Sequence, residues 1–394
     1  MTIHDLVCPG YQGASVAAGL KKNGLPDMGL IFSREPAAAA GVFTRNLVKA
    51  APVLVSREHL SLGACRAIVA NSGCANCCTG ETGLSDARET AKALSGLLSI
   101  SETDVCIGST GVIGKRLDMD KVRNSLPKLV SGLSEKGLEG FSRAIMTTDR
   151  FPKTEVRKIR VQDKTVTVLG IAKGAGMIRP DVATMLTFIL TDAKADAGTL
   201  SRVLKLASDR SFNCATVDGD TSTNDTVLLL ANGVSGADVA GFPGEFELAV
   251  TDVCVGLAKK MVADGEGATK TVVLTVQGLP TDGQARAVAD TIAHSQLVKT
   301  AMFGQDANWG RIVAAAGRSG VFMDERRLDL FFGQTLLFSD GEWQGPEAEA
   351  AASAVLKQDE IPMTLDLKSG PGRVVMFFSD LTIDYVKLNA DYRS

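Results

Sequence analysis

The chain has 394 residues, of which 45% are hydrophobic and 22% charged, and its formal net charge at pH 7 is −3. Such a chain can bury a large core and exceeds the usual size of one domain, and its composition excludes a disordered protein. The small net charge argues against nucleic acid or an anionic membrane as a partner. Residues 1–6 lack the features of a secretory signal, and no apolar run reaches membrane-spanning length. We therefore expect a cytoplasmic protein.

The first third of the chain predicts short strands mixed with helices. Strands are expected at 29–32, 51–55 and 67–70. Ser85 can cap a helix with an apolar face, and Asp118 can begin another. Pro127 should kink or shorten that second helix.

Eight cysteines are spread over the chain, and three of them, Cys74, Cys77 and Cys78, lie close together. A zinc site would need a second cysteine pair or suitably spaced histidines, and the three histidines are scattered. In a cytoplasmic chain these cysteines should be reduced thiols. We interpret the cluster as small buried residues in a tight turn, and we expect no metal.

Residues 106–114, Cys-Ile-Gly-Ser-Thr-Gly-Val-Ile-Gly, form a loop in which glycine recurs. Such a loop after a strand can present backbone N–H groups to an anion. By itself the pattern is more typical of a tight turn than of a site.

Further along, alternation and helical spacing predict most of the remaining elements. A hairpin is expected at 154–169, helices around 200–207, 246–257 and 284–300, and a strand at 373–378. The acidic run from Asp218 to Asp225 fails the calcium-loop pattern, because its sixth residue is Thr223 and its twelfth is Leu229. We assign that run no role.

The stretch from Lys173 to Leu186 combines a glycine- and proline-broken loop with an apolar run, and Thr184 lies at the junction. A threonine hydroxyl is a poor nucleophile unless a base activates it. Its own α-amino group can be that base, provided that the Ala183–Thr184 peptide bond is cut. The alternative is that Thr184 only opens a core strand.

The sequence Ala-Thr-Met-Leu at 183–186, together with Ser-Thr-Gly-Val-Ile-Gly at 109–114 and Asn-Ser-Gly at 71–73, resembles the ornithine acetyltransferase family, the glutamate N-acetyltransferases of the cyclic arginine pathway. The resemblance spans nearly the whole chain. It implies an α/β fold with mixed sheets and packed helices, of the self-cleaving ornithine acetyltransferase type. It also implies cleavage into residues 1–183 and 184–394, assembly as a heterotetramer with two copies of each chain, and no cofactor.

The same resemblance assigns roles to individual residues. Thr184 would be the nucleophile, and the Thr110 hydroxyl with the Gly111 N–H would form the oxyanion hole. Substrate contacts would come from Thr147 (with Thr148 as the alternative), Lys173, Thr184, Glu266, Asn389 and Ser394. None of these motifs contains a histidine, which argues against a Ser-His-Asp triad.

The implied reaction is transfer of an acetyl group from N-acetylornithine to glutamate by double displacement, through an acetyl-Thr184 intermediate. Acetyl-CoA is expected as a second, weaker donor. One alternative is an ornithine acetyltransferase without the second activity. Another is a self-cleaving aminopeptidase, which predicts a serine where this chain has Thr184. A third alternative, a binding module without activity, would not explain why a carboxylate, a lysine and several hydroxyls of this chain all match one site.

Overall fold

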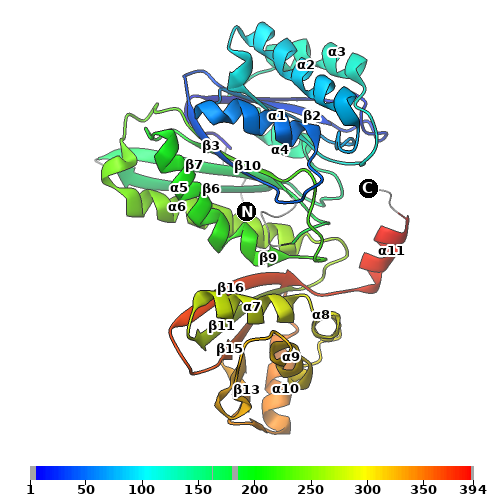
Figure 1. Cartoon of the computed structure of the whole chain (residues 1–394), viewed down its shortest axis with the longest axis vertical. Coiled ribbons are helices and arrows are strands. Elements are labelled where there is room, and N and C mark those ends of the chain that lie inside the picture. The colour runs from blue at the N-terminus through cyan, green and yellow to red at the C-terminus, as the bar shows by residue number, and fades with distance from the viewer. Residues whose placement is uncertain (1–5, 162, 180–184, 392–394) are drawn as a thin grey trace. The chain divides into compact units, whose positions relative to one another are not determined.

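The protein is described from a computed structural model, which covers residues 6–161, 163–179 and 185–391 (Figure 1). These residues form two compact units. The first contains the chain up to Asn213 together with Asp220–Leu257, and the second contains Cys214–Gly219 and the chain from Ala258 onward. No helix among the described residues is both long and apolar enough to cross a membrane.

The first sheet of the first unit has the strand order β1-β2-β4-β5. Its strands are β1 (Tyr11–Val16), β2 (Met28–Ser33), β4 (Ala67–Asn71) and β5 (Val105–Ser109). β4 and β5 are parallel, and the other pairs are antiparallel. The strands expected at 29–32 and 67–70 are confirmed. Residues 106–109 of the predicted glycine-spaced loop belong to β5, so the loop itself begins at Thr110.

The second sheet has the order β3-β10-β8-β7-β6. Its strands are β3 (Ala38–Phe43), β10 (Thr226–Ala231), β8 (Leu186–Thr191), β7 (Lys164–Lys173) and β6 (Lys153–Val161). The hairpin expected at 154–169 is therefore β6–β7. In the β7–β8 register Lys173 lies opposite Leu186, which places the end of β7 beside the start of the central strand.

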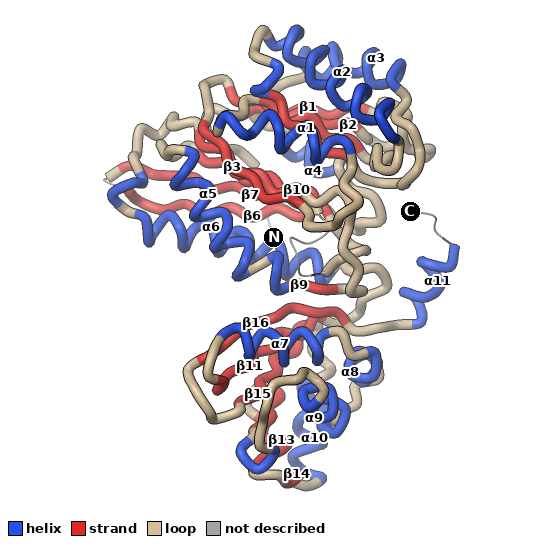
Figure 2. The backbone as a smooth tube through the Cα atoms, viewed as in Figure 1, coloured by secondary structure: helices blue, strands red, loops and turns tan. Residues whose placement is uncertain are grey.

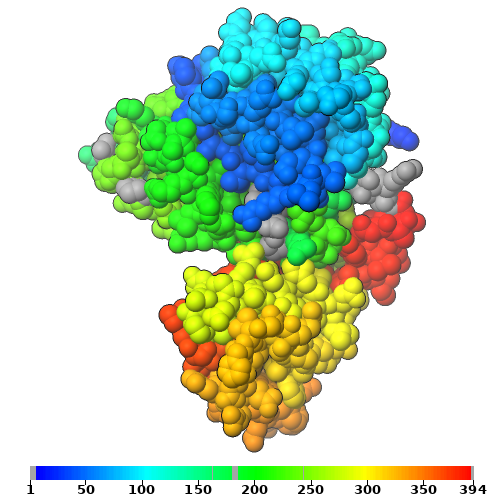
Figure 3. Space-filling model, viewed as in Figure 1, coloured from blue at the N-terminus to red at the C-terminus, as the bar shows by residue number. Residues whose placement is uncertain are grey.

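The helices of this unit are α1 (Ala51–His59), α2 (Gly80–Leu98), α3 (Met119–Ser131), α4 (Leu138–Ala144), α5 (Ala197–Arg210) and α6 (Pro243–Ala263), of which residues 258–263 belong to the second unit. Helices cover the outer faces of both sheets, which gives four layers (Figure 2), and α4 contributes Leu138 and Phe141 to the core between the sheets. Residues of α1, α2 and α3 form one apolar core with the first sheet, and a second core lies between the two sheets. Figure 3 shows in cyan the outer surface that α2 and α3 form.

The second unit is built on one mixed sheet with the order β14-β13-β12-β15-β11-β16-β9. Its strands are β9 (Ala215–Thr216), β11 (Thr271–Leu279), β12 (Asp329–Phe332), β13 (Thr335–Ser339), β14 (Glu342–Trp343), β15 (Glu360–Asp366) and β16 (Gly372–Ser379). The helices are α7 (Asp282–Ala293), α8 (Gln296–Phe303), α9 (Trp309–Gly317), α10 (Pro346–Val355) and α11 (Ile383–Asp391). The strand expected at 373–378 is β16, and one core joins this sheet to α7, α8, α9 and α10.

One expected strand is a helix. Residues 51–55 form the first turns of α1, although Val53 and Val55 are β-branched. Pro52 lies in the first turn, where proline is tolerated because its missing N–H has no intrahelical partner. Ser56 then exchanges hydrogen bonds with Ile107 of β5, donating to its carbonyl at 2.8 Å and accepting from its N–H at 2.7 Å. These contacts with a strand 51 residues away stabilise the helix.

Three helix boundaries also differ from expectation. The helix expected at 284–300 is two helices, because Ser295 breaks it and caps α8 by accepting from the Val298 N–H. Ser85 lies inside α2, which begins at Gly80. Pro127 lies inside α3, which continues to Ser131 because its apolar face is buried on both sides of the proline.

Candidate active site

The loop after β5 has a backbone geometry that only glycine fits at its centre. The Thr110 N–H donates to the Asn71 carbonyl at 3.0 Å. Gly111 has φ +121°, and a Cβ built there would lie 2.6 Å from the Gly73 carbonyl carbon. A side chain at position 111 would therefore be strained and would clash with the Asn-Ser-Gly turn.

Two polar side chains hold this loop against that turn. The Ser109 hydroxyl donates to Asn71 Oδ1 at 2.6 Å. Asn224 Nδ2 donates to the carbonyls of both Ala75 and Ser109, at 2.7 and 2.8 Å. Sequence reasoning assigned Asn224 no role. The available signal was its position just before the buried strand β10, where a buried amide must find partners.

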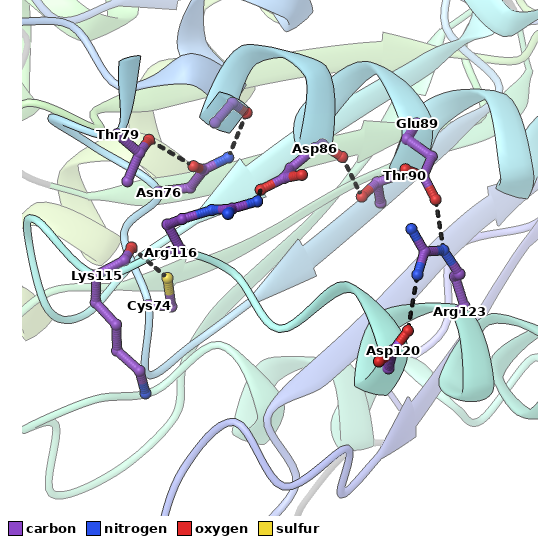
Figure 4. A network of polar contacts seen from close by, with 11 residues as sticks. Cys74, Asn76, Thr79, Asp86, Glu89, Thr90, Lys115, Arg116, Asp120 and Arg123 are labelled. Atoms are coloured by element: carbon purple, nitrogen blue, oxygen red, sulfur yellow. Dashed lines mark hydrogen bonds and ion pairs between the residues drawn. The ribbon is translucent and has the colours of Figure 1, made fainter. Parts of the chain in front are cut away.

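Figure 4 shows how the rest of the loop is anchored to α2. Cys74 Sγ donates to the Lys115 carbonyl at 3.2 Å, and the Arg116 guanidinium lies 3.5 Å from Asp86 of α2. Asn76 Nδ2 donates to the Gly83 carbonyl at 2.9 Å. The loop is therefore fixed along its length.

The structure places Lys173, a predicted substrate-binding residue, beside the predicted oxyanion hole. It is the last residue of β7, it is buried, and its Nζ donates to Thr110 Oγ1 at 3.1 Å. Because the Thr110 hydroxyl oxygen accepts this hydrogen bond, the Thr110 hydroxyl proton can be donated to a different acceptor. The two residues are 63 positions apart in the sequence, and the pairing of sheet and loop makes them neighbours.

Asp149 links Lys173 to the predicted substrate-binding threonine. Its side chain and that of Lys153 are fully buried, and Lys153 Nζ lies 2.6 Å from Asp149 Oδ1. The carboxylate also accepts from the N–H groups of Gly174 (2.7 Å) and Thr147 (2.9 Å). Burial raises the pKa of Asp149, but the ammonium groups of Lys173 and Lys153 outweigh burial and hold that pKa well below its ordinary value.

Asp149 was not singled out from the sequence. It follows Thr147 and Thr148, both half-buried in the loop between α4 and β6. The Thr147 N–H donates to Asp149, which places Thr147 beside the cluster of Asp149 and Lys173. The choice between Thr147 and Thr148 as the substrate contact stays a prediction.

The expected cleavage site, Ala183 and Thr184, lies outside the described residues. The residue that follows it is described: the Met185 N–H donates to Asp225 Oδ1 at 3.0 Å. Asp225 is buried, which raises its pKa well above the ordinary value against the opposing effect of the Met185 N–H. Asp225 therefore fixes the backbone at the start of β8, a role that sequence reasoning did not find.

The second unit holds another pair of predicted residues. Asn389 Nδ2 in α11 donates to Glu266 Oε2 at 3.0 Å, and both side chains belong to this unit. Gly267 has φ +68°, and a Cβ there would lie 2.3 Å from the Tyr385 N atom. The start of α11 therefore packs directly on the backbone beside Glu266. Ser394 lies outside the described residues.

The cysteine cluster shows no metal-ligand geometry. Cys74 and Cys77 are buried, as predicted, but Cys78 is exposed, so the prediction of burial is wrong for Cys78. Among the described residues no group of three or more histidine, cysteine or acidic side chains could hold a metal ion.

The fold is mixed α/β, and its candidate site combines the buried Lys173 with the turn at Thr110 and Gly111. Such an arrangement of a cation, a hydroxyl and backbone N–H groups can bind an anion. Its sequence belongs to a known family: the ArgJ family matches residues 12–394, and the chain is a member of it. The arginine biosynthesis bifunctional protein ArgJ of Geobacter sulfurreducens is 49% identical over 389 residues, covering 98% of this chain and 99% of the relative. That of Syntrophotalea carbinolica is 48% identical over 390 residues, with the same coverage.

Solved structures of relatives are also similar. The arginine biosynthesis bifunctional protein of Bacillus halodurans is 37% identical and covers 45% of this chain and 92% of its own, with a TM-score of 0.43. The ornithine acetyltransferase of Mycobacterium tuberculosis, solved with ornithine, is 39% identical and covers 46% of this chain and 95% of its own, with a TM-score of 0.41.

Proposed function

We propose that this protein is a glutamate N-acetyltransferase of arginine biosynthesis, which moves the acetyl group of N-acetylornithine to glutamate. The observation that carries the proposal is the hydrogen bond from Lys173 Nζ to Thr110 Oγ1, beside the left-handed turn at Gly111. It sets a cation, a hydroxyl and a backbone N–H side by side, as recognition of a carboxylate and stabilisation of an oxyanion require. Family membership and the names of the relatives support the same reaction.

Each predicted residue has a task in this scheme. The Thr184 hydroxyl attacks the acetyl carbonyl, and its α-amino group takes the proton. The Thr110 hydroxyl and the Gly111 N–H stabilise the oxyanion; removal of one such donor typically costs about 100- to 1,000-fold in kcat. Ornithine leaves, and the glutamate amine then takes the acetyl group from Thr184. Lys173 binds a substrate carboxylate, and Glu266 binds the side-chain ammonium of ornithine.

The same nucleophile would carry out maturation. Attack of the Thr184 hydroxyl on the Ala183 carbonyl would give an ester, and its hydrolysis would free the amine. The products would be chains of 183 and 394 − 183 = 211 residues. We propose that two copies of each chain assemble into a heterotetramer in the cytoplasm, that no cofactor takes part, and that Ser394 and Asn389 contribute to substrate binding.

Acetyl-CoA is proposed as a second acetyl donor, in line with the word bifunctional in the names of the relatives. The sequence contains no phosphate-binding loop for coenzyme A. We therefore expect acetylornithine to be much the better donor, with the thioester reacting through its own reactivity at Thr184. The assay is acetylglutamate formation with each donor in turn, and fast turnover at low acetyl-CoA would contradict this ranking.

A Thr184→Ala variant tests the nucleophile. It should stay uncut on a denaturing gel and should form no acetylglutamate, whereas Thr184→Ser should keep part of both activities because serine also carries a hydroxyl. Cleavage of Thr184→Ala at the same bond would assign the cut to another protease. Hydrolysis of peptide amides by the wild type, without acetyl transfer, would favour the aminopeptidase alternative.

A Glu266→Gln variant tests recognition of ornithine. Loss of the carboxylate should raise KM or lower kcat for acetylornithine by about tenfold or more, since hydrogen bonds to charged groups are worth about 1.5–3 kcal/mol. Unchanged kinetics with both substrates would remove Glu266 from the site.

A further inference from the structure

The proposed reaction presents one enzyme with two side chains of opposite charge. Ornithine ends in an ammonium group, whereas glutamate ends in a carboxylate. In a double-displacement scheme the two amino acids present the same α-amine and α-carboxylate to the same nucleophile. A carboxylate that suits ornithine repels the end of glutamate, so glutamate requires a cation besides the one that binds its α-carboxylate.

A second lysine lies beside the oxyanion turn in the first unit. Lys21 is half-buried in the loop between β1 and β2. A Cβ built at Gly73 would lie 3.1 Å from Lys21 Cγ, and one built at Gly111 would lie 2.6 Å from the Gly73 carbonyl carbon. One layer of backbone, the Asn-Ser-Gly turn, therefore separates the Lys21 stem from Gly111.

The ammonium group of Lys21 binds the backbone next to the predicted substrate-binding threonine. Its Nζ donates to the Met146 carbonyl at 3.2 Å, one residue before Thr147. The Lys21 backbone is fixed as well, because its N–H donates to the buried carboxylate of Asp27 at 2.8 Å. A lysine held at both ends of its side chain is a defined binding group and not a freely moving surface cation.

The described charges of this cluster have a positive sum. Lys21, Lys153 and Lys173 contribute three positive charges, and Asp27 and Asp149 contribute two negative ones, so these five residues carry 3 − 2 = +1. Asp27 accepts from the N–H groups of Ala18 and Lys21, and Asp149 accepts from Lys153, Gly174 and Thr147. Burial lowers the pKa of Lys21, the two aspartates raise it and Lys173 lowers it further, so an added carboxylate is favoured there.

We propose that Lys21 binds the side-chain carboxylate of the glutamate acceptor and so determines acceptor specificity. This inference rests on the transfer proposed above. Lys173, which donates to Thr110 Oγ1, then binds the α-carboxylate that both amino acids share. Lys21 then acts only when the acceptor is bound.

The test compares L-glutamate with L-glutamine, which has the same shape and no side-chain charge, as acceptors from acetylornithine. The wild type should prefer glutamate. In Lys21→Met the ratio of kcat/KM for glutamate to that for glutamine should fall at least about tenfold, the usual effect of losing a hydrogen bond to a charged group. Lys21→Arg should restore part of the preference. Lys22→Met, a change at the exposed neighbouring lysine, should leave the ratio at the wild-type value.

A donor-only assay separates this role from a structural one. Exchange of labelled ornithine into N-acetylornithine involves no glutamate, so Lys21→Met should impair the glutamate reaction at least about tenfold more than the exchange. Equal losses in both reactions, or an unchanged acceptor ratio, would overturn the inference. Absence of acetylglutamate with the wild-type protein would instead overturn the proposed function, and the role of Lys21 with it.

Discussion

Asp149 in the first unit and Asp380 in the second are buried carboxylates that fix the loops carrying predicted substrate-binding residues. Asp149 accepts from two backbone N–H groups and also forms a fully buried ion pair with Lys153. Asp380 accepts from the N–H groups of Thr269 and Lys270, at 2.9 and 3.0 Å, and from the Thr269 hydroxyl. The first loop is therefore held by a direct buried ion pair as well as by hydrogen bonds, and the second by hydrogen bonds to its carboxylate.

The buried lysines of the two units differ in the same way. Lys153 meets a carboxylate at 2.6 Å. Lys299 of the second unit donates to the carbonyls of Val217 and Ser379 and to the Ser379 hydroxyl, which lies 3.2 Å away. Carbonyl oxygens stabilise an ammonium less than a carboxylate does. The stability of the first unit should therefore depend more on a direct ion pair, and that of the second more on hydrogen bonds to the backbone.

The largest effect is expected from Asp149→Ala. Removing the carboxylate breaks the fully buried ion pair with Lys153, which typically costs about 3–5 kcal/mol of unfolding free energy. Urea denaturation measures this loss. As a control, Glu139→Ala removes the exposed ion pair with Arg143 and should cost less than about 1 kcal/mol. A similar small loss for both variants would show that the buried pair contributes little.

The Asp149–Lys153 ion pair should also make the stability of the protein depend on pH in acid. The pKa of Asp149 is lowered in the folded state, so its contribution to stability is fully present above its ordinary pKa of 3.8 and is lost as the pH falls below that value. Asp149→Asn should therefore flatten the loss of stability in acid relative to the wild type.

The second largest effect is expected from Lys299 at alkaline pH. Burial lowers its pKa from 10.5 to about 8, against the opposing charges of Asp218 and Asp380. Between these values the unfolded chain holds a proton that the folded chain has lost, so stability rises with pH. Relative to Lys299→Met, the wild type should gain on the order of 3 kcal/mol from pH 8 to 10.5. Parallel pH profiles of urea denaturation for the two proteins would contradict this expectation.

Asp380→Ala should have a smaller effect than Asp149→Ala, because Asp380 accepts hydrogen bonds from backbone N–H groups and a hydroxyl, whereas Asp149 forms a direct buried ion pair. It leaves the N–H groups of Thr269 and Lys270 without this acceptor, at a cost of about 2 kcal/mol. The KM for acetylornithine should also rise, since these residues follow the loop of Glu266. Asp380→Asn keeps an acceptor oxygen and should recover part of both losses. A loss as large as that of Asp149→Ala would remove the contrast between the two units.

The most local effect is expected from Gly267→Ala. A left-handed backbone costs a residue with a side chain about 1–2 kcal/mol, and the new Cβ would lie 2.3 Å from the Tyr385 N atom, so the start of α11 must shift. Hydrogen exchange should show faster opening of α11. Gly317→Ala in the same unit meets no atom within 4 Å and should leave the exchange unchanged. Equal exchange rates in both variants would show that α11 does not depend on this close approach.

The sequence by itself determined the features that depend on neighbours along the chain. Alternation identified the hairpin β6–β7, and helical spacing identified α5 and α6, because burial of one face imposes its period on the sequence. Asp118 caps α3 by accepting from the Lys121 N–H, as its position indicated. Family resemblance supplied Thr110, Gly111, Lys173 and Glu266 as candidates, although no local pattern singled them out.

Only the tertiary structure decided which of these residues meet. Lys173 reaches Thr110 across 63 residues, and Asn389 reaches Glu266 across 123. Residues 51–55 became a helix because Ser56 found its partners on β5. Asp149 and Lys21 acquired their importance from burial beside other charges, and the energy of a charge depends on everything packed around it. That environment is assembled from distant segments, so no local period in the sequence records it.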